Sequence, residues 1–120
     1  MYEEGFTQIT NLDYSTTAMK IMNERYKELD YKIEYLNMNL NDIKNLKSSE
    51  YNVIIDKGTL DSILCGENSL PLISNMMKEI FRILAPEGYY FCISYGDEDH
   101  RKTFFVLIIN LDRNNLGNKY

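Results

Sequence analysis

Three side chains that accept hydrogen bonds stand at or just past the ends of short apolar runs: Asp13, Asn39 and Asp56. In open parallel sheets, ligands bind outside the carboxyl ends of the strands, so these are the positions at which chemistry is expected. Carboxylate and amide oxygens accept hydrogen bonds from ligand hydroxyl and amino groups. The pattern therefore predicts a ligand site at the strand ends.

Asp13 allows two interpretations from the residues alone. An acidic residue that ends the second strand of a nucleotide-binding half accepts hydrogen bonds from ribose hydroxyls. An aspartate is equally suited to capping the helix that follows. Ser15 and Thr16 are also residue types that can cap this helix. Both interpretations stay open at this point.

The segment from Asp56 to Asp61 places two carboxylates, an ammonium group and a glycine immediately after an apolar run. A structural interpretation pairs Lys57 with Asp56 or Asp61 and lets Asp61 start a short helix, because charges at a strand end are costly unless paired. A functional interpretation makes Asp56 a wall of the reaction site and Lys57 a contact to a bound cofactor. The residues alone favour the structural interpretation.

Strand-like runs alternate with helical ones along the whole chain. The expected strands are Gln8–Asp13, Ile33–Asn37, Tyr51–Asp56, Tyr89–Ser94 and Phe104–Ile109. The β-branched run in the third of these is typical of a strand buried on both faces. This alternation predicts an α/β fold with a mostly parallel sheet, right-handed crossovers and helices on both faces.

Two amphipathic helices are expected between these strands. The first carries a stripe of Ala18, Ile21, Met22 and Tyr26. The second carries a longer stripe: Leu72, Ile73, Met76, Met77, Ile80, Phe81 and Leu84. We expect it to end at the Pro86–Gly88 turn, because proline cannot continue a helix.

Composition excludes several classes of protein. The 120 residues are 44% hydrophobic, which suits one globular domain. A net charge of −5 without a Lys/Arg stripe argues against nucleic acid as a partner but is compatible with a basic protein surface. Two cysteines form neither a disulfide framework nor a zinc site, so no metal is expected. No run approaches the roughly 20 apolar residues of a membrane span, and no signal peptide opens the chain, so a cytoplasmic location is expected.

Three segments carry a resemblance to a known family: residues 9–15, 51–61 and 83–89. They resemble consecutive motifs of the seven-β-strand, Rossmann-like, S-adenosylmethionine-dependent methyltransferases. The eukaryotic methyltransferase-like group that includes the elongation factor 1-alpha lysine methyltransferases is the most similar. The likeness is strongest over residues 1–100, and its most specific part is the Asp56–Asp61 run. It implies a single partial methyltransferase domain over residues 1–120, with a divergent tail from 106 to 120.

The resemblance also implies roles for particular residues, with S-adenosylmethionine as cofactor. It places ribose and adenine beside Asp13 and Tyr14, and the adenine amino group beside Asn39 and Leu40. The family usually has an aspartate where this chain has Asn39, but an amide oxygen also accepts a hydrogen bond. Asp56, Lys57 and Gly58 match the loop beside the methionine end, and Asp56 is the catalytic candidate.

The expected reaction is methyl transfer from S-adenosylmethionine to a protein side chain, with lysine nitrogen as the acceptor. The acidic chain suits a target with a basic or lysine-bearing surface, for which a translation factor is a candidate. One alternative is a non-catalytic remnant or binding module with a methyltransferase fold. Another is a nicotinamide-dinucleotide domain, which the Asp56–Asp61 loop disfavours.

The beginning of the chain departs from the family, whose members open with an apolar strand and a glycine-rich loop. Residues 1–6 instead resemble the end of a helix, with Gly5 as its left-handed C-cap. We therefore expect an N-terminally truncated form. In the family the absent strand lies between the strands ending at Asp13 and Asp56, so these two strands should either pair directly or remain as unpaired edges that invite another chain.

Overall fold

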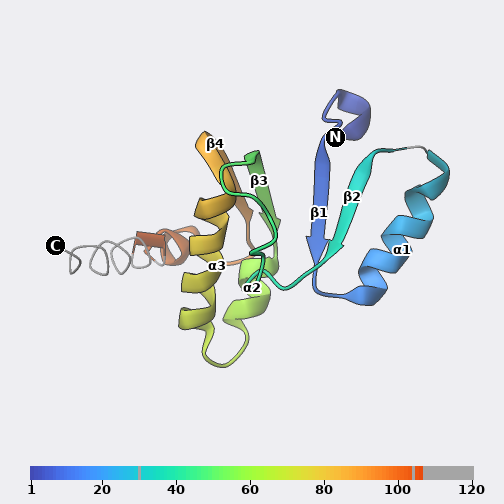
Figure 1. Ribbon diagram of the computed structural model, residues 1–120. Helices are drawn as coiled ribbons and strands as arrows, with labels where there is room; N and C mark the ends of the chain where they lie inside the picture. The colour runs from blue at the N-terminus through green and yellow to red at the C-terminus, as the bar shows by residue number, and fades with distance from the viewer. Residues whose placement is uncertain (30, 104, 107–120) are drawn as a thin grey trace. The chain divides into compact units, whose positions relative to one another are not determined.

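The computed structural model describes residues 1–29, 31–103 and 105–106, in which four strands alternate with helices (Figure 1). The chain divides into two compact units, Met1–Leu46 and Lys47–Tyr120. Each unit holds one pair of parallel strands joined by helical structure. The predicted α/β class with parallel strands is confirmed.

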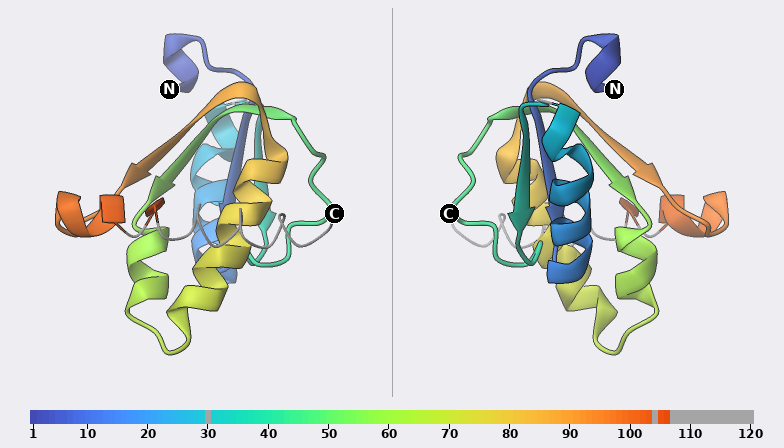
Figure 2. Two further views of the ribbon diagram at one scale, coloured as in Figure 1. Left: turned by 90° about the vertical axis from the view of Figure 1, so that its left-hand side faces the viewer. Right: turned by 90° about the vertical axis from the view of Figure 1, so that its right-hand side faces the viewer.

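The first unit is a strand–helix–strand arrangement. Its elements are the 3-10 helix η1 (Tyr2–Glu4), β1 (Ile9–Asp13), α1 (Thr16–Tyr26), the 3-10 helix η2 (Lys27–Leu29) and β2 (Ile33–Asn37). The strands β1 and β2 pair in parallel from Ile9 opposite Ile33 to Asp13 opposite Asn37. Figure 2 shows α1 running alongside this pair. Gly5 adopts a φ of 98° after η1, which is the predicted left-handed C-cap.

The start of α1 follows from its capping residue. The Ser15 side chain accepts a hydrogen bond from the Ala18 N–H at 3.2 Å, as an N-cap serine does. The predicted apolar stripe of this helix is less buried than expected. Ala18, Met22 and Tyr26 are half-buried, whereas Ile21 is exposed. Because α1 packs on only two strands within its unit, it has little sheet to cover.

The second unit is built in the same way with a longer crossover. Its elements are β3 (Tyr51–Lys57), α2 (Thr59–Leu64), α3 (Ser69–Ile83) and β4 (Leu84–Ile93), and β3 pairs with β4 in parallel. The helices α2 and α3 pack on each other and on the strands (Figure 2). The buried core residues of this unit are Leu60, Ile73, Met76, Met77, Ile80 and Ile83. Each such side chain stabilises the fold by about 1.5–3 kcal/mol when fully buried.

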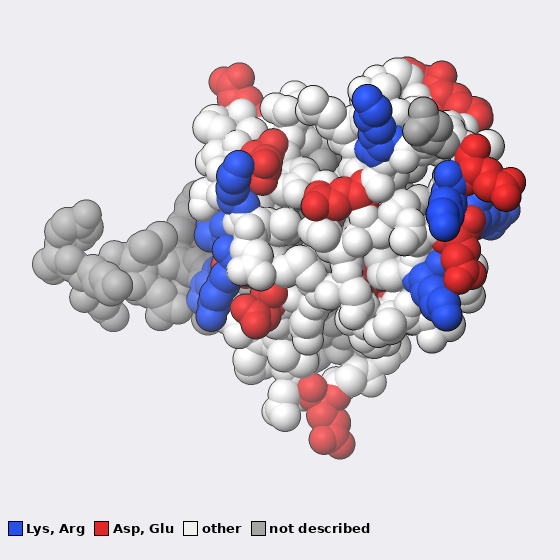
Figure 3. Space-filling model, turned by 45° about the vertical axis from the view of Figure 1, so that its right-hand side comes forward, with Lys and Arg blue, Asp and Glu red and all other residues white. Residues whose placement is uncertain are grey.

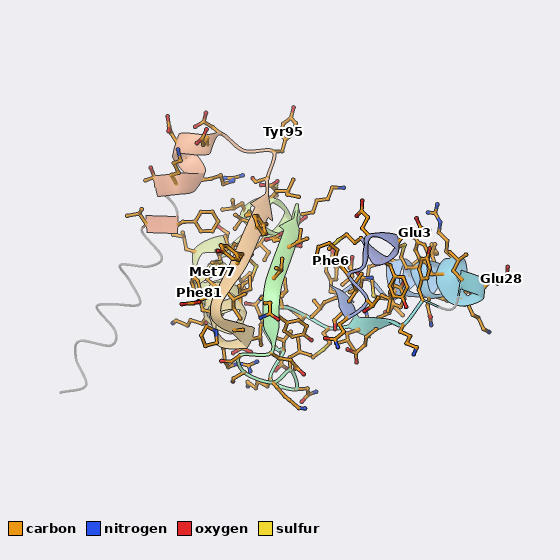
Figure 4. All side chains as sticks on the ribbon, turned by 90° about the horizontal axis from the view of Figure 1, so that it is seen from above. Glu3, Phe6, Glu28, Met77, Phe81 and Tyr95 are labelled. Atoms are coloured by element: carbon orange, nitrogen blue, oxygen red, sulfur yellow. The ribbon has the colours of Figure 1, made fainter. Side chains whose placement is uncertain are left out.

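The helix α3 confirms the long predicted stripe at its centre and corrects it at its edges. Met77 is buried, whereas Phe81, which is labelled with it in Figure 4, remains 50% exposed, and Leu72 is also exposed. The helix ends at Ile83, not at the Pro86–Gly88 turn, and Leu84 already has extended backbone. A residue before proline disfavours helical backbone, so a helix stops ahead of Pro86.

Burial of β3 on both faces was predicted and is wrong. Val53 and Ile55 are 45% and 47% exposed, while Ile54 and Asp56 on the other face are covered. The exposed face continues on β4, where Tyr89 and Phe91 are exposed. Among the described elements, α2 and α3 cover a single face of this strand pair.

The predicted fifth strand is also wrong within the described residues. Residues 98–103 and 105–106 are helical, so Phe105 and Val106 belong to a helix, and residues 104 and 107–109 lie outside the described residues. Within the described chain, β1 pairs with β2 and β3 pairs with β4, so the strands ending at Asp13 and Asp56 do not pair with each other. No helix in the described ranges is long and apolar enough to cross a membrane.

Candidate functional site

Asp13 ends β1, and its carboxylate faces the turn that leads into α1. Its Oδ1 atom accepts a 2.8 Å hydrogen bond from the Ser15 N–H, which forms a short side-chain turn. Ser15, and not Asp13, is the residue that caps α1. The structural role left for Asp13 is to position Ser15 through the hydrogen bond from the Ser15 N–H. Within the described part of the chain, Oδ2 of Asp13 accepts no hydrogen bond. That oxygen remains as an acceptor for a ligand hydroxyl.

The other residues predicted for the adenosine end lie near Asp13 in the same unit. Tyr14 follows it with a side chain that is 78% exposed. The Met38 N–H donates to the Asp13 carbonyl oxygen at 3.1 Å, which brings the turn after β2 beside the end of β1. Asn39 on this turn is exposed and Leu40 is half-buried. The unit therefore brings these four predicted residues to one edge of the strand pair.

The amide of Asn39 is already engaged in its own turn. Its Oδ1 atom accepts from the Asn41 N–H at 2.9 Å and lies 3.4 Å from the Asn41 side-chain nitrogen. The adenine amino group needs an acceptor, and this oxygen is the one that Asn39 offers. Binding of adenine at Asn39 therefore requires the oxygen to share its lone pairs with Asn41.

Asp56 is buried at the end of β3 and accepts three hydrogen bonds. The N–H groups of Thr59 and Leu60 donate at 2.9 Å and 3.3 Å, and the Tyr90 hydroxyl donates at 2.9 Å. The side chain is only 6% exposed. Asp56 thus fixes the first turn of α2 and joins it to β4, because buried carboxylates persist where hydrogen bonds satisfy them.

Tyr90 is kept as a hydrogen-bond donor by its surroundings. Burial, followed by the charge of Asp56, raises the pKa of the Tyr90 hydroxyl well above its usual range. Burial and the same carboxylate also raise the pKa of the neighbouring Cys92 thiol. Both groups are therefore uncharged at neutral pH.

Lys57 and Gly58 form the turn between β3 and α2. Lys57 is exposed, and the Gly58 N–H donates to the Ile93 carbonyl oxygen at 3.0 Å. Gly58 has a φ of 78°, a left-handed conformation that favours glycine. The turn therefore presents an ammonium group at the carboxyl end of the sheet, next to the last residue of β4.

Asp61 is paired differently from the sequence interpretation, which gave Lys57 as a partner of Asp56 or Asp61. Its Oδ1 atom accepts from the Ser94 hydroxyl at 2.5 Å and from Arg101 Nη2 at 2.8 Å, and its Oδ2 atom accepts from the Tyr95 N–H at 2.8 Å. The Ser94 hydrogen bond, then those of Tyr95 and Arg101, lower the pKa of Asp61. The pairing with Arg101 spans 40 residues, which no local spacing rule predicts.

Sequence reasoning missed Tyr90, Ser94 and Arg101. Strand periodicity places Tyr90 on one face with Cys92, but it does not show that this face carries Asp56. The register places Ile54 opposite Tyr90 and Asp56 opposite Cys92, so Tyr90 shares the face of Asp56. For Arg101 the signal was masked by the polar 97–102 run, which reads as a solvated loop.

Acidic and basic side chains are mixed on the face of the molecule that Figure 3 shows. Among the residues that the structure describes, no group of three or more His, Cys, Asp or Glu side chains is arranged to hold a metal ion.

Parallel strands with hydrogen-bond acceptors at their carboxyl ends define the Rossmann-like class of nucleotide-binding α/β proteins. Within that class, the model of the methyltransferase domain family matches residues 1–114, and the chain belongs to this family.

Curated relatives agree with this assignment. The chain is 32% identical over 96 residues to the eEF1A lysine and N-terminal methyltransferase of Bos taurus, covering 78% of the chain and 14% of that protein. It is 33% identical over 98 residues to the Danio rerio protein of the same name, covering 82% and 14%. It is also 27% identical over 100 residues to EEF1A lysine methyltransferase 4 of Bos taurus, covering 75% and 38%. The chain thus spans about one seventh of the length of the first relatives it matches.

Solved structures support the fold. A Methanococcus maripaludis protein assigned to the S-adenosylmethionine-dependent methyltransferases has a TM-score of 0.58 at 18% identity, over 88% of this chain and 46% of that one. A Pyrococcus horikoshii protein has a TM-score of 0.64 at 20% identity, over 76% and 40%. The Rossmann-like methyltransferase fold expected from the motifs is therefore confirmed.

Proposed function

We propose that the chain contributes to S-adenosylmethionine-dependent methylation of a protein lysine. The family match over residues 1–114 carries this proposal, and the names of the curated relatives, lysine methyltransferases of eEF1A, support the acceptor. A translation factor with a lysine-bearing surface is the proposed partner, in the cytoplasm, without nucleic acid or membrane. Residues 1–120 are proposed to act as part of one methyltransferase domain, with residues 106–120 as a divergent tail.

The adenosine end of the cofactor fits the residues of the first unit. Oδ2 of Asp13 is available to accept from a ribose hydroxyl, and the exposed ring of Tyr14 offers an aromatic face. Asn39 and Leu40 are proposed beside the adenine. Asn39 fits less well than the other residues, because its amide oxygen already accepts from Asn41.

Residues of the second unit are proposed at the methionine end. S-adenosylmethionine supplies an electrophilic methyl group, so the protein chiefly orients the acceptor and excludes water. The exposed ammonium of Lys57 is suited to the cofactor carboxylate, and Gly58 permits the turn that presents it. Each of these roles is a proposal for the residue at that position.

The catalytic role that the sequence predicts for Asp56 remains a prediction, and the geometry supports a narrower form of it. Because the buried carboxylate accepts three hydrogen bonds, it is suited to positioning the Lys57–Gly58 turn. The same observation favours the second candidate, a non-catalytic binding module, since all three hydrogen bonds of the carboxylate are made within the protein. The two candidates differ in whether methyl transfer occurs.

Transfer of a radiolabelled methyl group from S-adenosylmethionine to purified elongation factor 1-alpha tests the proposal. It requires labelled lysine in the acceptor, identified by mass spectrometry, and slower turnover in Asp56→Ala at unchanged cofactor affinity. Cofactor binding by calorimetry without any label in the acceptor would favour the binding module. Absence of both binding and transfer would reject the cofactor assignment.

A further inference from the structure

The loop that follows β4 is fixed by a network of side chains in the second unit. Asp61 accepts from the Ser94 hydroxyl, from the Tyr95 N–H and from Arg101, at 2.5 Å, 2.8 Å and 2.8 Å. Arg101 Nε also donates to the Ser94 hydroxyl at 2.8 Å. Charge-assisted hydrogen bonds of this kind are stronger than neutral ones, so the backbone at Tyr95 is held in one position.

Gly96 lies against the Arg101 side chain in this arrangement. A Cβ atom at position 96 would lie 2.2 Å from Arg101 Nη2. A larger residue there would therefore require the flexible Arg101 side chain to shift. The Gly96 N–H adds a further hydrogen bond to the Ser94 hydroxyl at 3.1 Å.

The side chain that this fixed loop presents is an aromatic ring in solvent. Tyr95 is 102% exposed, and no large apolar side chain among the described residues is more exposed. Figure 4 shows the Tyr95 ring projecting away from the second unit. A single exposed tyrosine is ordinary on a protein surface. Tyr95 differs because Asp61 and Arg101 hold its backbone in place. Packing of the ring does not explain this arrangement, since the ring is fully exposed.

The position of Tyr95 places it at the functional edge of the strand pair. Lys57 lies opposite Ile93, and the Gly58 N–H donates to the Ile93 carbonyl oxygen at 3.0 Å. Tyr95 follows two residues later, beyond the carboxyl end of β4. Ligands of parallel sheets bind outside this end of the strands.

The charge around Tyr95 favours a cation. Residues 97–99 are acidic and exposed, and with Asp61 they supply four carboxylates against three basic groups, Lys57, Arg101 and Lys102, for a local charge of −1. Two of these basic groups are already paired, Arg101 with Asp61 and Lys102 with Glu98 at 2.5 Å. An exposed aromatic face beside excess carboxylates is a site for a positively charged side chain.

We propose that Tyr95 is a specificity-determining residue that binds a cationic side chain next to the lysine to be methylated. This inference rests on the proposed protein-lysine methylation and names the feature of the acceptor that is recognised. The lysine that reacts must be neutral to attack the methyl group. The cation on Tyr95 is therefore a neighbouring basic side chain, and the acceptor segment carries at least two basic residues.

Fluorescence anisotropy of a labelled peptide of alternating lysine and glycine tests this, using the 120-residue chain under conditions in which circular dichroism shows it folded and light scattering detects no aggregates. Tyr95→Ala should weaken binding about two- to fivefold, as loss of an exposed cation–π contact does. Tyr95→Phe should bind as the unchanged chain does, because it keeps the ring. Phe6→Ala removes another exposed aromatic, in the first unit, and should have no effect.

Three results would overturn the inference: no peptide binding by the unchanged chain, equal binding by Tyr95→Ala, or equal binding of a peptide whose lysines are acetylated. Titration of the same variants with S-adenosylhomocysteine distinguishes failure of the Tyr95 inference from failure of the proposed function. Failure of the unchanged chain to bind that ligand would contradict the cofactor assignment. Peptide binding that depends on Tyr95 would still support the inference.

Discussion

The Tyr90 hydroxyl donates a 2.9 Å hydrogen bond to Oδ2 of Asp56, the oxygen that also accepts from the N–H of Leu60. This one contact joins β4, the end of β3 and the first turn of α2. Asp56, the residue that the sequence predicts to be catalytic, therefore also stabilises the turn between β3 and α2.

The first prediction concerns this contact. Tyr90→Phe should lower the free energy of unfolding by about 1.5–3 kcal/mol, the range for a lost hydrogen bond to a charged group. Urea denaturation measures it in an extended version, in which the strand and glycine-rich loop of a curated relative precede Met1. Tyr89→Phe, on the exposed face, is the control and should stay within about 0.5 kcal/mol. Equal losses in both variants would show that the Asp56 contact contributes nothing.

The second prediction concerns cofactor affinity. The 120-residue chain should bind S-adenosylmethionine weakly, because it offers the adenosine contacts at Asp13 and Tyr14 without a glycine-rich loop among its described residues. Isothermal titration calorimetry of the chain and of the extended version compares the two. Low-micromolar affinity of the 120-residue chain would mean that such a loop is not needed.

The third prediction separates the two interpretations of Asp13. In the extended version, Asp13→Ala should weaken cofactor binding by about 1.5–3 kcal/mol, because a charged acceptor of the ribose is lost. Ser15→Ala removes the α1 cap, which costs about 1 kcal/mol of stability, but should leave the cofactor dissociation constant unchanged. If Asp13→Ala also left that constant unchanged, Asp13 would only position Ser15.

The fourth prediction is a dependence on acid. Hydrogen bonds from Ser94, then from Tyr95 and Arg101, lower the pKa of Asp61 in the folded chain. The stabilisation is therefore fully present above the unfolded pKa, about 3.9, and is lost as pH falls through the lower folded pKa. Stability of the extended version, measured between pH 6 and pH 2, should decline less steeply in Asp61→Asn. Asp42→Asn, an exposed carboxylate 4.0 Å from Lys44, should keep the original slope.

The fifth prediction concerns the isolated chain. Two separate pairs of parallel strands leave unpaired edges, which invite association with other chains. A pair of strands is also marginally stable in water without covering structure. We expect the 120-residue chain to aggregate or be partly molten, and the extended version to unfold cooperatively as a monomer. Circular dichroism with light scattering compares them, and a sharp, reversible transition of the 120-residue chain as a monomer would refute this.

Local sequence signals predicted most of the elements. The strands ending at Asp13 and Asn37 follow from residues close together in the chain and are confirmed. A cap at Ser15 or Thr16 was predicted in the same way, and the structure has Ser15 in that role. Gly5 was likewise identified as a left-handed C-cap, because few other residues tolerate that backbone. Such features need no knowledge of distant contacts.

Predictions that depended on what covers an element were less successful. The apolar run of β3 indicated burial on both faces, but one face is exposed. An apolar run does not show whether helices cover both faces of the sheet. The aromatic run beginning at residue 104 indicated a strand, yet Phe105 is helical and its ring contacts that of Tyr90 edge-on at 6.3 Å. The Asp61–Arg101 pair was missed because 40 residues separate its members.

The interruption of β4 at Pro86–Gly88 decides which of two adjacent tyrosines meets Asp56. Between Tyr51 opposite Leu84 and Val53 opposite Tyr89, β3 advances two residues while β4 advances five. Side chains of a strand alternate between its two faces, so an advance of an even number of residues keeps the face and an odd number changes it. The odd advance in β4 therefore puts each later residue of β4 on the opposite face from the one it would have in an uninterrupted strand. Deleting one residue from the interruption would bring Tyr89 inward and turn Tyr90 to solvent. A change in the length of this turn would therefore alter the chemistry beside the carboxylate without altering any residue that touches it.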